Sequence, residues 1–469
     1  MIVSELIQMA SRQFEQKMSE FGKDWDTDRL TADLANHVRI ALEEAFSHAS
    51  RQAYKWFLER YDLQQPLIEW QGQTLRFKTI STKTFLTSFG TIPVERRLYQ
   101  ADTGGSSHVP LDHLWDMDGQ FATDDVRQAV CFAMAHMTAE ETEQLLRLCS
   151  SFRPSATAIK HIAEKVCREI APHQELLDRK IQLQIEPPEQ TLVMVASMDG
   201  ANVLLRERGT HRGRPYERPR PESNETKNAT YKNAMVGAIS FYGPVREDHK
   251  GPERLRSFYS ARMPEDRAVR FKVDFERHLE VMENKLDSGV VKVLLCDGQR
   301  ALWNYAEHNE RFDSYEKLVD FYHTEEHLSK AAEALFGKNS VDGRRWYARY
   351  RAKLLEQDDG VEALRRSIDY HGRTRRLRQS SRKALSTERT FFRRNGSRMS
   401  YACFRRRGLP IGSGPVEAAC KSIVKTRLCR SGMRWSREGG QRILDFRCYV
   451  KSGLWNEFWD TYRHIRCSA

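Results

Sequence analysis

The stretch TLVMVASMDG, Thr191–Gly200, is an apolar run that ends in an aspartate followed by a glycine. A second stretch, VVKVLLCDGQ at Val290–Gln299, ends in the same way. Short apolar runs rich in β-branched residues indicate buried strands. Because functional groups gather at the carboxyl ends of strands in open α/β sheets, Asp199 and Asp297 are predicted to meet at one sheet edge. One Asp-Gly pair is commonly only a turn, whereas two such pairs favour a shared site.

The glycine after each aspartate is predicted to allow a sharp backbone turn and to leave space for a ligand. Two carboxylates at close range repel each other, and they stay ionised mainly with a cation between them. Hard oxygen ligands suit Mg²⁺ or Mn²⁺. The pair therefore predicts a divalent metal site, and a site for two metals requires a third acid.

The segment GLPIGSGPVEAACKSIVKTRL, Gly408–Leu428, supplies the third acid. Pro415 suits the first turn of a helix, and Glu417 falls in that same turn. Lys421 and Lys425 follow at intervals of four residues, so a regular helix would place them on the face of Glu417. The helix would hold a metal at its start and a DNA phosphate further along. An ordinary surface helix with Glu–Lys pairs explains the spacing equally well.

The 469 residues predict two to four domains. Helical periodicity, alternating strand patterns and turn residues divide the chain into an N-terminal helical region, a small β module, a helical region, a first core segment, a basic helical insertion, and a second core segment with C-terminal helices. The corresponding ranges are 1–62, 63–118, 119–185, 190–337, 338–407 and 408–469.

The helical region 119–185 contains a helix, a short turn and a second helix. Thr138 and Glu141 have the spacing of a capping box, and Pro154 with Ser155 separates the two helices. This outline is that of a DNA-reading helix-turn-helix, and an ordinary helical hairpin fits it equally well.

Positive charge is concentrated in one segment. The whole chain carries a net charge of +12, whereas Arg344–Arg407 alone has 20 Lys and Arg against 6 Asp and Glu, a net charge of +14. The rest of the chain is therefore slightly negative. A surplus of this size favours a surface that contacts a phosphate backbone over a merely solvated helical face.

The expected environment is a reducing one. The nine cysteines are scattered and form no C-x-x-C pair, which is typical of a cytoplasmic protein without a structural zinc site. No apolar run approaches the roughly 18 residues that would cross a bilayer, so no membrane partner is expected. A DNA partner would associate the protein with the nucleoid.

Four blocks of sequence resemble one known family. They are SMDG at Asp199, LLCDGQRALWNYA at Asp297, DFYHTEEHLSKAAEALFG from Asp320, and PIGSGPVEAACKSIVKTRL with the later GMRW around and beyond Glu417. Together they resemble bacterial insertion-sequence transposases of the DDE type, in the Kra-four group related to the Mutator superfamily. The resemblance covers roughly residues 190 to 450, and before that only GTIPVERRLY is reminiscent of the family.

The resemblance implies an α/β fold with an RNase H-like mixed sheet core and an all-helical insertion before the glutamate. It implies that Asp199, Asp297 and Glu417 are the catalytic, metal-binding triad, and that Asp320 and His323 form an accessory motif. It also implies DNA partners, namely transposon terminal inverted repeats and target DNA, and a homo-oligomer on that DNA. Residues expected to contact DNA are Lys421, Lys425, Arg427, Arg430, Arg434, Arg375 and Arg376.

Two other functions remain open from the sequence. HTEEH, His323–His327, matches the H-x-x-E-H signature of a zinc hydrolase, with two histidines on one helix face. A non-catalytic DNA-binding remnant of a transposase is the other alternative. Trp435 is a candidate for stacking on an exposed base. The basic loop Arg206–Pro221 would either lie along DNA or be a solvated excursion.

Overall fold

The structure is a computed structural model that describes residues 2–25, 29–206, 231–246 and 251–468. The chain forms two compact units. The N-terminal unit comprises Met1–Gln174 and Tyr462–Ala469, and the sheet unit comprises Glu175–Thr461. Apart from Arg206, the basic loop expected to follow DNA lies outside the described residues.

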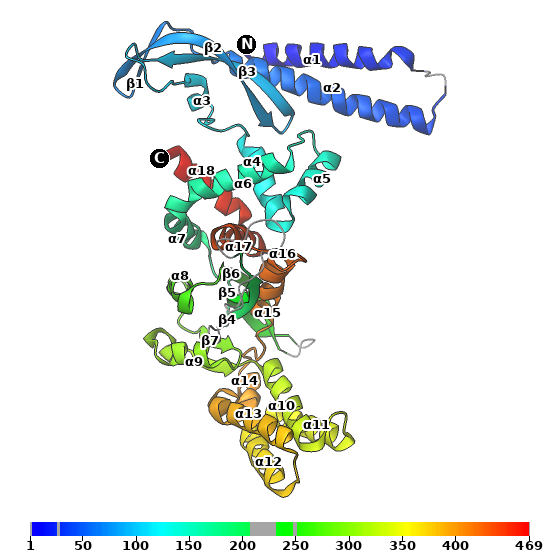
Figure 1. The fold of residues 1–469 in the computed structure, drawn as a ribbon, viewed down its shortest axis with the longest axis vertical. Coiled ribbons are helices and arrows are strands. Elements are labelled where there is room, and N and C mark those ends of the chain that lie inside the picture. Colours follow the sequence, from blue (N-terminus) through cyan, green and yellow to red (C-terminus); the bar gives the residue numbers. More distant parts are fainter. Residues whose placement is uncertain (1, 26–28, 207–230, 247–250, 469) are drawn as a thin grey trace, which may run out of the picture. The chain divides into compact units, whose positions relative to one another are not determined.

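The N-terminal unit begins with two long helices, α1 (Ile2–Phe21) and α2 (Ala32–Glu59), that lie side by side (Figure 1). The rings of Phe14 and Phe46 contact each other across the pair, with centroids 4.5 Å apart. A stripe of small residues spaced four apart is buried along α2, consisting of Ala41, Ala45, Ala49 and Ala53. Residues at this spacing share one helix face, so α2 lets a neighbour approach its backbone closely.

A small antiparallel sheet follows, as the alternating pattern predicts. Its strands, in spatial order, are β1 (Leu67–Trp70), β2 (Gln73–Thr87) and β3 (Gly90–Gln100). Gly90 has a φ of 109°, which only glycine adopts without strain, and it forms the turn between β2 and β3.

Four helices complete this unit up to residue 170: α3 (Pro110–Leu114), α4 (Asp124–His136), α5 (Ala139–Cys149) and α6 (Ala156–Ile170). The capping box is confirmed, because Thr138 Oγ1 accepts from the Glu141 amide at 3.2 Å and Glu141 accepts from the Thr138 amide at 2.8 Å. Ser155, in the predicted break between the two helices, caps α6. These contacts fix the helix ends and do not distinguish a DNA-reading pair from an ordinary hairpin.

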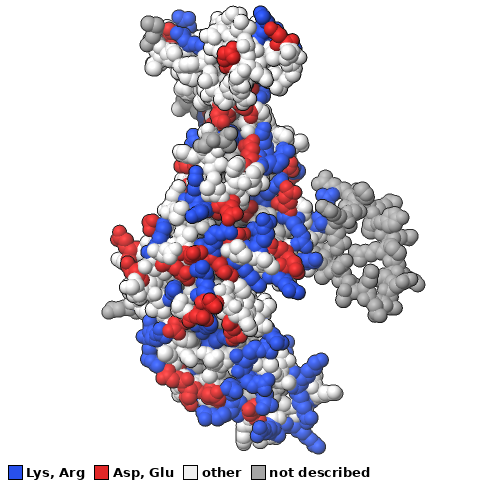
Figure 2. All heavy atoms as spheres, turned by 90° about the vertical axis from the view of Figure 1, so that its left-hand side faces the viewer, with Lys and Arg blue, Asp and Glu red and all other residues white. Residues whose placement is uncertain are grey.

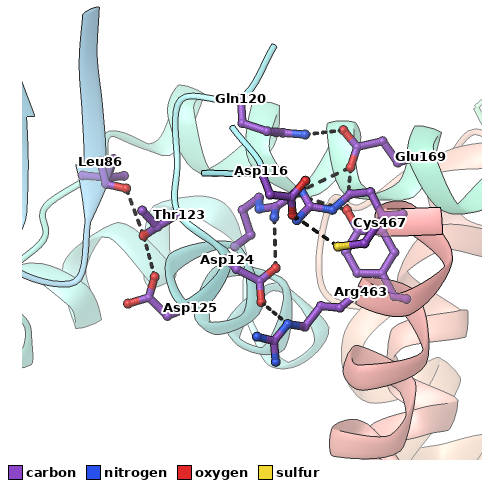
Figure 3. Close-up of polar contacts among 12 residues, drawn as sticks. Leu86, Asp116, Gln120, Thr123, Asp124, Asp125, Glu169, Arg463 and Cys467 are labelled. Carbon is purple, nitrogen blue, oxygen red and sulfur yellow. Dashed lines mark hydrogen bonds and ion pairs between the residues drawn. The ribbon is translucent and has the colours of Figure 1, made fainter. Parts of the chain in front are cut away.

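The last turns of the chain dock onto α4. Helix α18 (Trp455–Ser468) brings Arg463 to Asp124, at 3.1 Å (Figure 3). Arg127 is only 2% exposed, donates to Asp124 at 2.9 Å and contacts the Tyr462 hydroxyl at 3.3 Å. Because Tyr462 onward belongs to the N-terminal unit, the segment predicted as a second core part contributes to both units.

The sheet unit is built on a five-stranded mixed sheet, and the chain is therefore mixed α/β. In spatial order the strands are β6 (Pro252–Arg262), β5 (Tyr231–Val245), β4 (Val193–Leu204), β7 (Val291–Cys296) and β8 (Glu316–Val319). The pairs β4–β5 and β5–β6 are antiparallel, whereas β4–β7 and β7–β8 are parallel. The two apolar runs at Thr191–Gly200 and Val290–Gln299 correspond to the adjacent strands β4 and β7.

Helices flank this sheet. They are α8 (Val269–Glu283), α9 (Arg300–Glu307) and α17 (Arg437–Lys451). Helix α7 (Gln174–Gln184) precedes the sheet and contacts α17, where the Tyr449 hydroxyl donates to Asp178. The Phe275 ring of α8 packs so close to Gly237 of β5 that a side chain at residue 237 would overlap it. The buried strands and these apolar helix faces form the core that supports the strand ends.

A group of helices separates β8 from the glutamate segment (Figure 1). They are α10 (Phe321–Phe336), α11 (Val341–Glu356), α12 (Gly360–Thr374), α13 (Gln379–Asn395) and α14 (Tyr401–Arg406). The predicted basic insertion at 338–407 is thus helical. α10 packs against α13, so the bundle begins earlier than predicted, immediately after β8.

Candidate active site

The two aspartates lie at the carboxyl edge of the parallel strand pair, though in different ways. Asp297 directly follows β7, as predicted. Asp199 does not end its strand, because β4 continues to Leu204 and Asp199 pairs with Val236 of β5. The β4–β7 pairing stops three residues before Asp199. Strand β4 therefore continues to pair with its antiparallel partner β5 after its pairing with the parallel strand β7 has ended.

The glycines after these aspartates have a different role from the predicted one. Neither Gly200 nor Gly298 has a positive φ. Gly200 lies inside β4, so the expectation of a sharp turn is wrong there, whereas Gly298 does lie at a bend between β7 and α9. At Gly298 the space is filled by the Phe391 ring of α13, which a Cβ would overlap. At Gly200 a Cβ would lie 3.3 Å from the Asn233 side chain. Glycine is needed at residue 298 because the helical insertion packs directly against the Asp297 loop.

The glutamate segment starts as predicted and then changes geometry. α15 (Gly414–Ala419) has Pro415 and Glu417 in its first turn. A π-helical turn (Cys420–Lys425) follows, and then the short α16 (Thr426–Leu428). The predicted regular helix through Lys425 is therefore wrong, because the wider turn changes the angular spacing of the side chains. Such π-turns often occur at functional sites.

A buried arginine accounts for the π-turn. Arg447 of α17 is 3% exposed, and its Nε donates to the Ile423 carbonyl oxygen at 2.7 Å. A second guanidinium nitrogen donates to the Ser422 carbonyl oxygen. Buried carbonyl groups require such partners when the regular helical ladder does not supply them. The guanidinium thus holds the backbone in the π conformation.

The three predicted acids converge. Asp199, Asp297 and Glu417 line one pocket of about 250 Å³ in the sheet unit, and Lys421 and Lys425 line it too. The other residues lining it are Met198, His323, Glu326, Ser413, Val416 and Cys420. Three carboxylates from distant parts of the chain, two lysines and a histidine therefore share one surface hollow.

The electrostatics of the pocket favour a cation. Burial raises the pKa of Asp297, and the negative charges of Asp199 and Asp320 raise it further. Burial also raises the pKa of Glu417, with Asp320 and Asp199 adding to the effect while Lys421 opposes it. Carboxylates that raise one another's pKa are stabilised in the ionised form by a bound cation.

The carboxylate oxygens of the pocket are the type of ligand that a hard divalent cation prefers. Asp199 Oδ1 accepts from the Gly200 amide at 2.6 Å, and Asp297 Oδ1 accepts from the Gln299 amide at 3.0 Å. Each carboxylate has a second oxygen, and carboxylate oxygens are the ligands that Mg²⁺ and Mn²⁺ prefer. Within the described residues, however, no group of three or more His, Cys, Asp or Glu side chains is assembled to hold a metal ion. The pocket has the ligand chemistry and lacks a preformed coordination group.

The predicted accessory residue Asp320 connects the elements around the pocket. Its side chain is completely buried, accepts from the His323 amide at 2.7 Å and also accepts from the Ser413 amide. Its own amide donates to the Cys296 carbonyl oxygen at 2.9 Å. Asp320 therefore joins the end of β7, the start of α10 and the loop that precedes Glu417.

The zinc-hydrolase motif is not arranged as a zinc site. His323 and His327 do share a face of α10, with their Nε2 atoms 3.3 Å apart. Glu326 Oε2 lies 3.8 Å from His323 Nδ1. His327 Nδ1 contacts Glu388 at 2.5 Å, and its ring stacks on Phe391, an arrangement that a metal-bound histidine would also have. The described part of the chain places no further ligand beside the two rings to complete a zinc site.

The basic residues beyond Glu417 divide into exposed and buried ones. Lys421, Lys425 and Arg434 are exposed, and Arg430 is half-buried with its Nε donating to the Thr426 carbonyl oxygen. Arg427 is only 2% exposed, so the expectation that it contacts DNA is wrong. The π-turn rotates this position toward the core.

The Trp435 side chain makes contacts within the protein. Its Nε1 donates to the Leu428 carbonyl oxygen at 3.0 Å, and the guanidinium of Arg427 lies over its ring, 5.2 Å from the centroid. Its backbone pairs with the end of β4, with its amide donating to the Leu204 carbonyl oxygen at 3.1 Å. These contacts anchor the GMRW segment, and Arg427 already lies over one face of the half-buried ring on which a base would stack.

A surface that we call the basic corner lies where α12 meets α13. It consists of Arg373, Arg375, Arg376, Arg378, Arg382 and Lys383, all exposed. Figure 2 shows Lys and Arg gathered over the helical insertion. Within the described chain none of the six forms a salt bridge, whereas Arg366 and Arg389 nearby pair with Asp359 and Asp369. The sequence indicated the basic segment and could not separate its paired from its unpaired residues.

Sequence reasoning missed Glu388, Phe391 and Cys420 as neighbours of the site. Glu388 is a buried acid on a strongly basic helix, which was the one signal available in the sequence. Cys420 lies beside Asp199 and hydrogen-bonds to it, and burial together with that negative charge raises the pKa of the thiol. A raised pKa makes this cysteine a poor nucleophile.

Comparisons with known proteins add a structural likeness only. No protein-family profile matches the chain, and no curated protein matches it. Among solved structures, a chain of the Drosophila P element transposase strand transfer complex is similar at 11% sequence identity and a TM-score of 0.21, covering 74% of this chain and 83% of that chain. A likeness at this level does not identify a family.

Proposed function

We propose that this protein is a DNA transposase of the DDE type, in line with its resemblance to the Kra-four group of insertion-sequence transposases. It would hydrolyse a phosphodiester bond at each transposon end and then join the freed 3′-hydroxyl to target DNA. The observation that carries the proposal is the convergence of Asp199, Asp297 and Glu417 on one pocket.

The sheet supports an RNase H-like assignment for the core. Three antiparallel strands continue into two parallel ones, and the first aspartate lies on the central strand β4. The second aspartate follows the adjacent parallel strand β7, and the glutamate comes from a helix that follows the helical insertion. A mixed five-stranded sheet with acids in these positions is the arrangement expected of an RNase H-like nuclease core.

Asp199, Asp297 and Glu417 are the residues that would hold Mg²⁺ or Mn²⁺, which when bound supplies a Lewis acid for phosphodiester cleavage. The chain itself contributes positive charge next to the acids. Lys421 and Lys425 line the same pocket and are exposed, so they can attract and orient a DNA phosphate there. Asp320 holds the loop before Glu417 against the end of β7, which keeps the acids near one another.

DNA beyond the pocket would be held by charge. The basic corner offers six exposed cations for backbone phosphates, and it includes Arg375 and Arg376. Sequence-specific contacts to the terminal inverted repeats are assigned to the N-terminal unit, where α5 and α6 form the helix pair.

Joining two transposon ends calls for a homo-oligomer on DNA. A cytoplasmic, nucleoid-associated protein is consistent with nine free cysteines, and no helix among the described residues is long and apolar enough to cross a membrane.

The test is a nicking assay on DNA that carries the element's ends, with Mg²⁺ or Mn²⁺. We expect Asp199→Asn, Asp297→Asn and Glu417→Gln each to reduce nicking to background while DNA affinity is retained, because the acids act on the reacting phosphate. Asp287→Asn is the matched control, since Asp287 is exposed in the turn before β7. Wild-type nicking in all three variants would refute the assignment. DNA binding by the wild type without nicking would instead support a non-catalytic remnant.

A further inference from the structure

A chain of one buried and two half-buried side chains runs from the helical insertion to the pocket. Glu388 of α13 is 5% exposed, and its Oε2 lies 2.5 Å from His327 Nδ1 of α10. The Nε2 atom of His327 lies 3.3 Å from the Nε2 atom of His323. His323 lines the pocket together with Asp297 and Glu417. Three side chains thus connect the interior of the insertion to the carboxylates.

The hydrogen-bonding capacity of each group determines where the protons lie. An ionised carboxylate only accepts, so Glu388 requires a proton on His327 Nδ1. A neutral His327 then presents a lone pair at Nε2, and the contact with His323 requires the proton on His323 Nε2. In a neutral His323 the remaining nitrogen, Nδ1, carries the lone pair.

The lone pair of His323 is directed to the pocket side. Nε2 is committed to His327, which does not line the pocket, whereas Nδ1 lies on the side of Glu326, which does. The distance from Nδ1 to Glu326 Oε2 is 3.8 Å, beyond hydrogen-bonding range. Nδ1 is therefore positioned to accept a hydrogen bond from a molecule in the pocket.

An aromatic ring packs against this chain of side chains. The Phe391 ring stacks on the His327 ring with centroids 3.6 Å apart and an interplanar angle of 15°. The same Phe391 ring occupies the space beside Gly298, next to Asp297. One aromatic ring thus contacts both the histidine relay and the loop of the second aspartate. A shift of α13 would change both at once.

We propose that Glu388 and His327 are positioning residues that fix the orientation and tautomer of His323, so that His323 Nδ1 accepts a hydrogen bond from the attacking hydroxyl group. The effect of this positioning on catalysis rests on the proposed function. The existence of the Glu388–His327–His323 hydrogen-bond chain does not depend on that function. The basic insertion would then act on catalysis through Glu388 as well as contacting DNA.

The first experiment measures the ring nitrogens directly. In ¹⁵N-histidine-labelled full-length protein, NMR should show a protonated Nδ1 on His327 and a protonated Nε2 on His323, with signals assigned by loss in His327→Gln and His323→Gln. Glu388→Gln should change both rings, because an amide can donate as well as accept. The control Glu362→Gln, at an exposed acid on α12 paired with Arg365, should change neither. Protonation of His327 at Nε2 in the wild type would overturn the chain.

The second experiment measures single-turnover nicking. Loss of a side chain that orients a histidine of a site commonly costs about 10- to 100-fold, and we expect that loss of nicking for Glu388→Gln with DNA affinity unchanged. In a His323→Gln background the same substitution should have no further effect, since it acts through His323. Losses that multiply would show that Glu388 acts by another route. Absence of wild-type nicking would refute the proposed function, and the ring-nitrogen measurement would still decide whether the relay exists.

Discussion

Asp445 on α17 is a half-buried acid that couples folding to pH. Burial raises its pKa to about 7. The nearby charge of Asp178 acts in the same direction, while a hydrogen bond from Gln441 at 2.7 Å and the charge of Arg262 oppose it. An aspartate in the unfolded chain titrates near 3.8, so between these values the folded protein retains a proton that the unfolded chain has released.

This difference predicts that the Asp445 contribution to stability falls as pH rises from about 4 to 7. The slope is at most about 1.4 kcal/mol per pH unit for one proton. Urea unfolding of the wild type and Asp445→Asn at several pH values isolates the contribution as the difference between the two proteins. We expect the variant to gain stability relative to the wild type as pH rises and the difference to level off above pH 7. A difference that does not change with pH would contradict the account.

Arg427 shows how a single residue can be misassigned from spacing. Its place in a run of basic residues after Glu417 predicted a DNA contact. The π-turn before it changes the rotation per residue, so the side chain faces inward over Trp435. The local sequence does not predict the π-turn, because Arg447, which donates to its carbonyl groups, lies on another helix.

At the scale of elements, the contact between α13 and the Asp297 loop depends on one missing side chain. A Cβ at residue 298 would overlap the Phe391 ring, and that ring also stacks on His327. The helical insertion can therefore pack on the sheet only while residue 298 is glycine. Gly289, in the turn before β7, has no atom within 4 Å of an added Cβ.

Gly298→Ala should accordingly lower the free energy of unfolding by about 1–3 kcal/mol, the usual cost of overpacking. It should also reduce nicking, because α13 and the Asp297 loop must move apart. Urea unfolding and the nicking assay measure the two effects. Gly289→Ala serves as the control and should match the wild type in both. A Gly298→Ala protein as stable and active as the control would show that α13 does not press on this loop.

At the scale of the whole molecule, DNA affinity should depend on unpaired charge rather than on total charge. The basic corner holds six exposed cations without salt bridges among the described residues, whereas Arg366 and Arg389 are already paired with acids. A paired arginine contributes less to binding because its partner already neutralises it. Each phosphate contact releases counterions and contributes about 0.9 to the slope of log affinity against log salt.

We therefore expect the double variant Arg375→Gln and Arg376→Gln to reduce the magnitude of that slope by about 1.8. Fluorescence anisotropy with a DNA duplex at salt concentrations from about 50 to 200 mM measures it. The matched control replaces Arg366 and Arg389 by Gln and should change the slope less. Equal changes in the two double variants would indicate that binding follows net charge and not the basic corner.

The sequence by itself determined the local structure of this protein and its candidate acids. Alternating and apolar patterns predicted the strands, the Thr138–Glu141 spacing predicted the capping box, and the charge run predicted a basic helical insertion. Such features depend on neighbours a few residues apart, which periodicity and capping rules encode. Asp297 and Glu417 were identifiable because each stands at a strand or helix boundary, and Asp199 because it follows an apolar run and precedes a glycine.

Only the tertiary structure decided which of these residues meet. The β4–β7 pairing across nearly a hundred residues brings Asp199 and Asp297 to one edge, and the Asp320–Ser413 bond brings Glu417 to them. The extension of β4 beyond Asp199 and the Glu388–His327–His323 relay also arise from contacts between distant segments. A local pattern specifies which face of an element is apolar, whereas the partner of that face is set by packing of the whole chain.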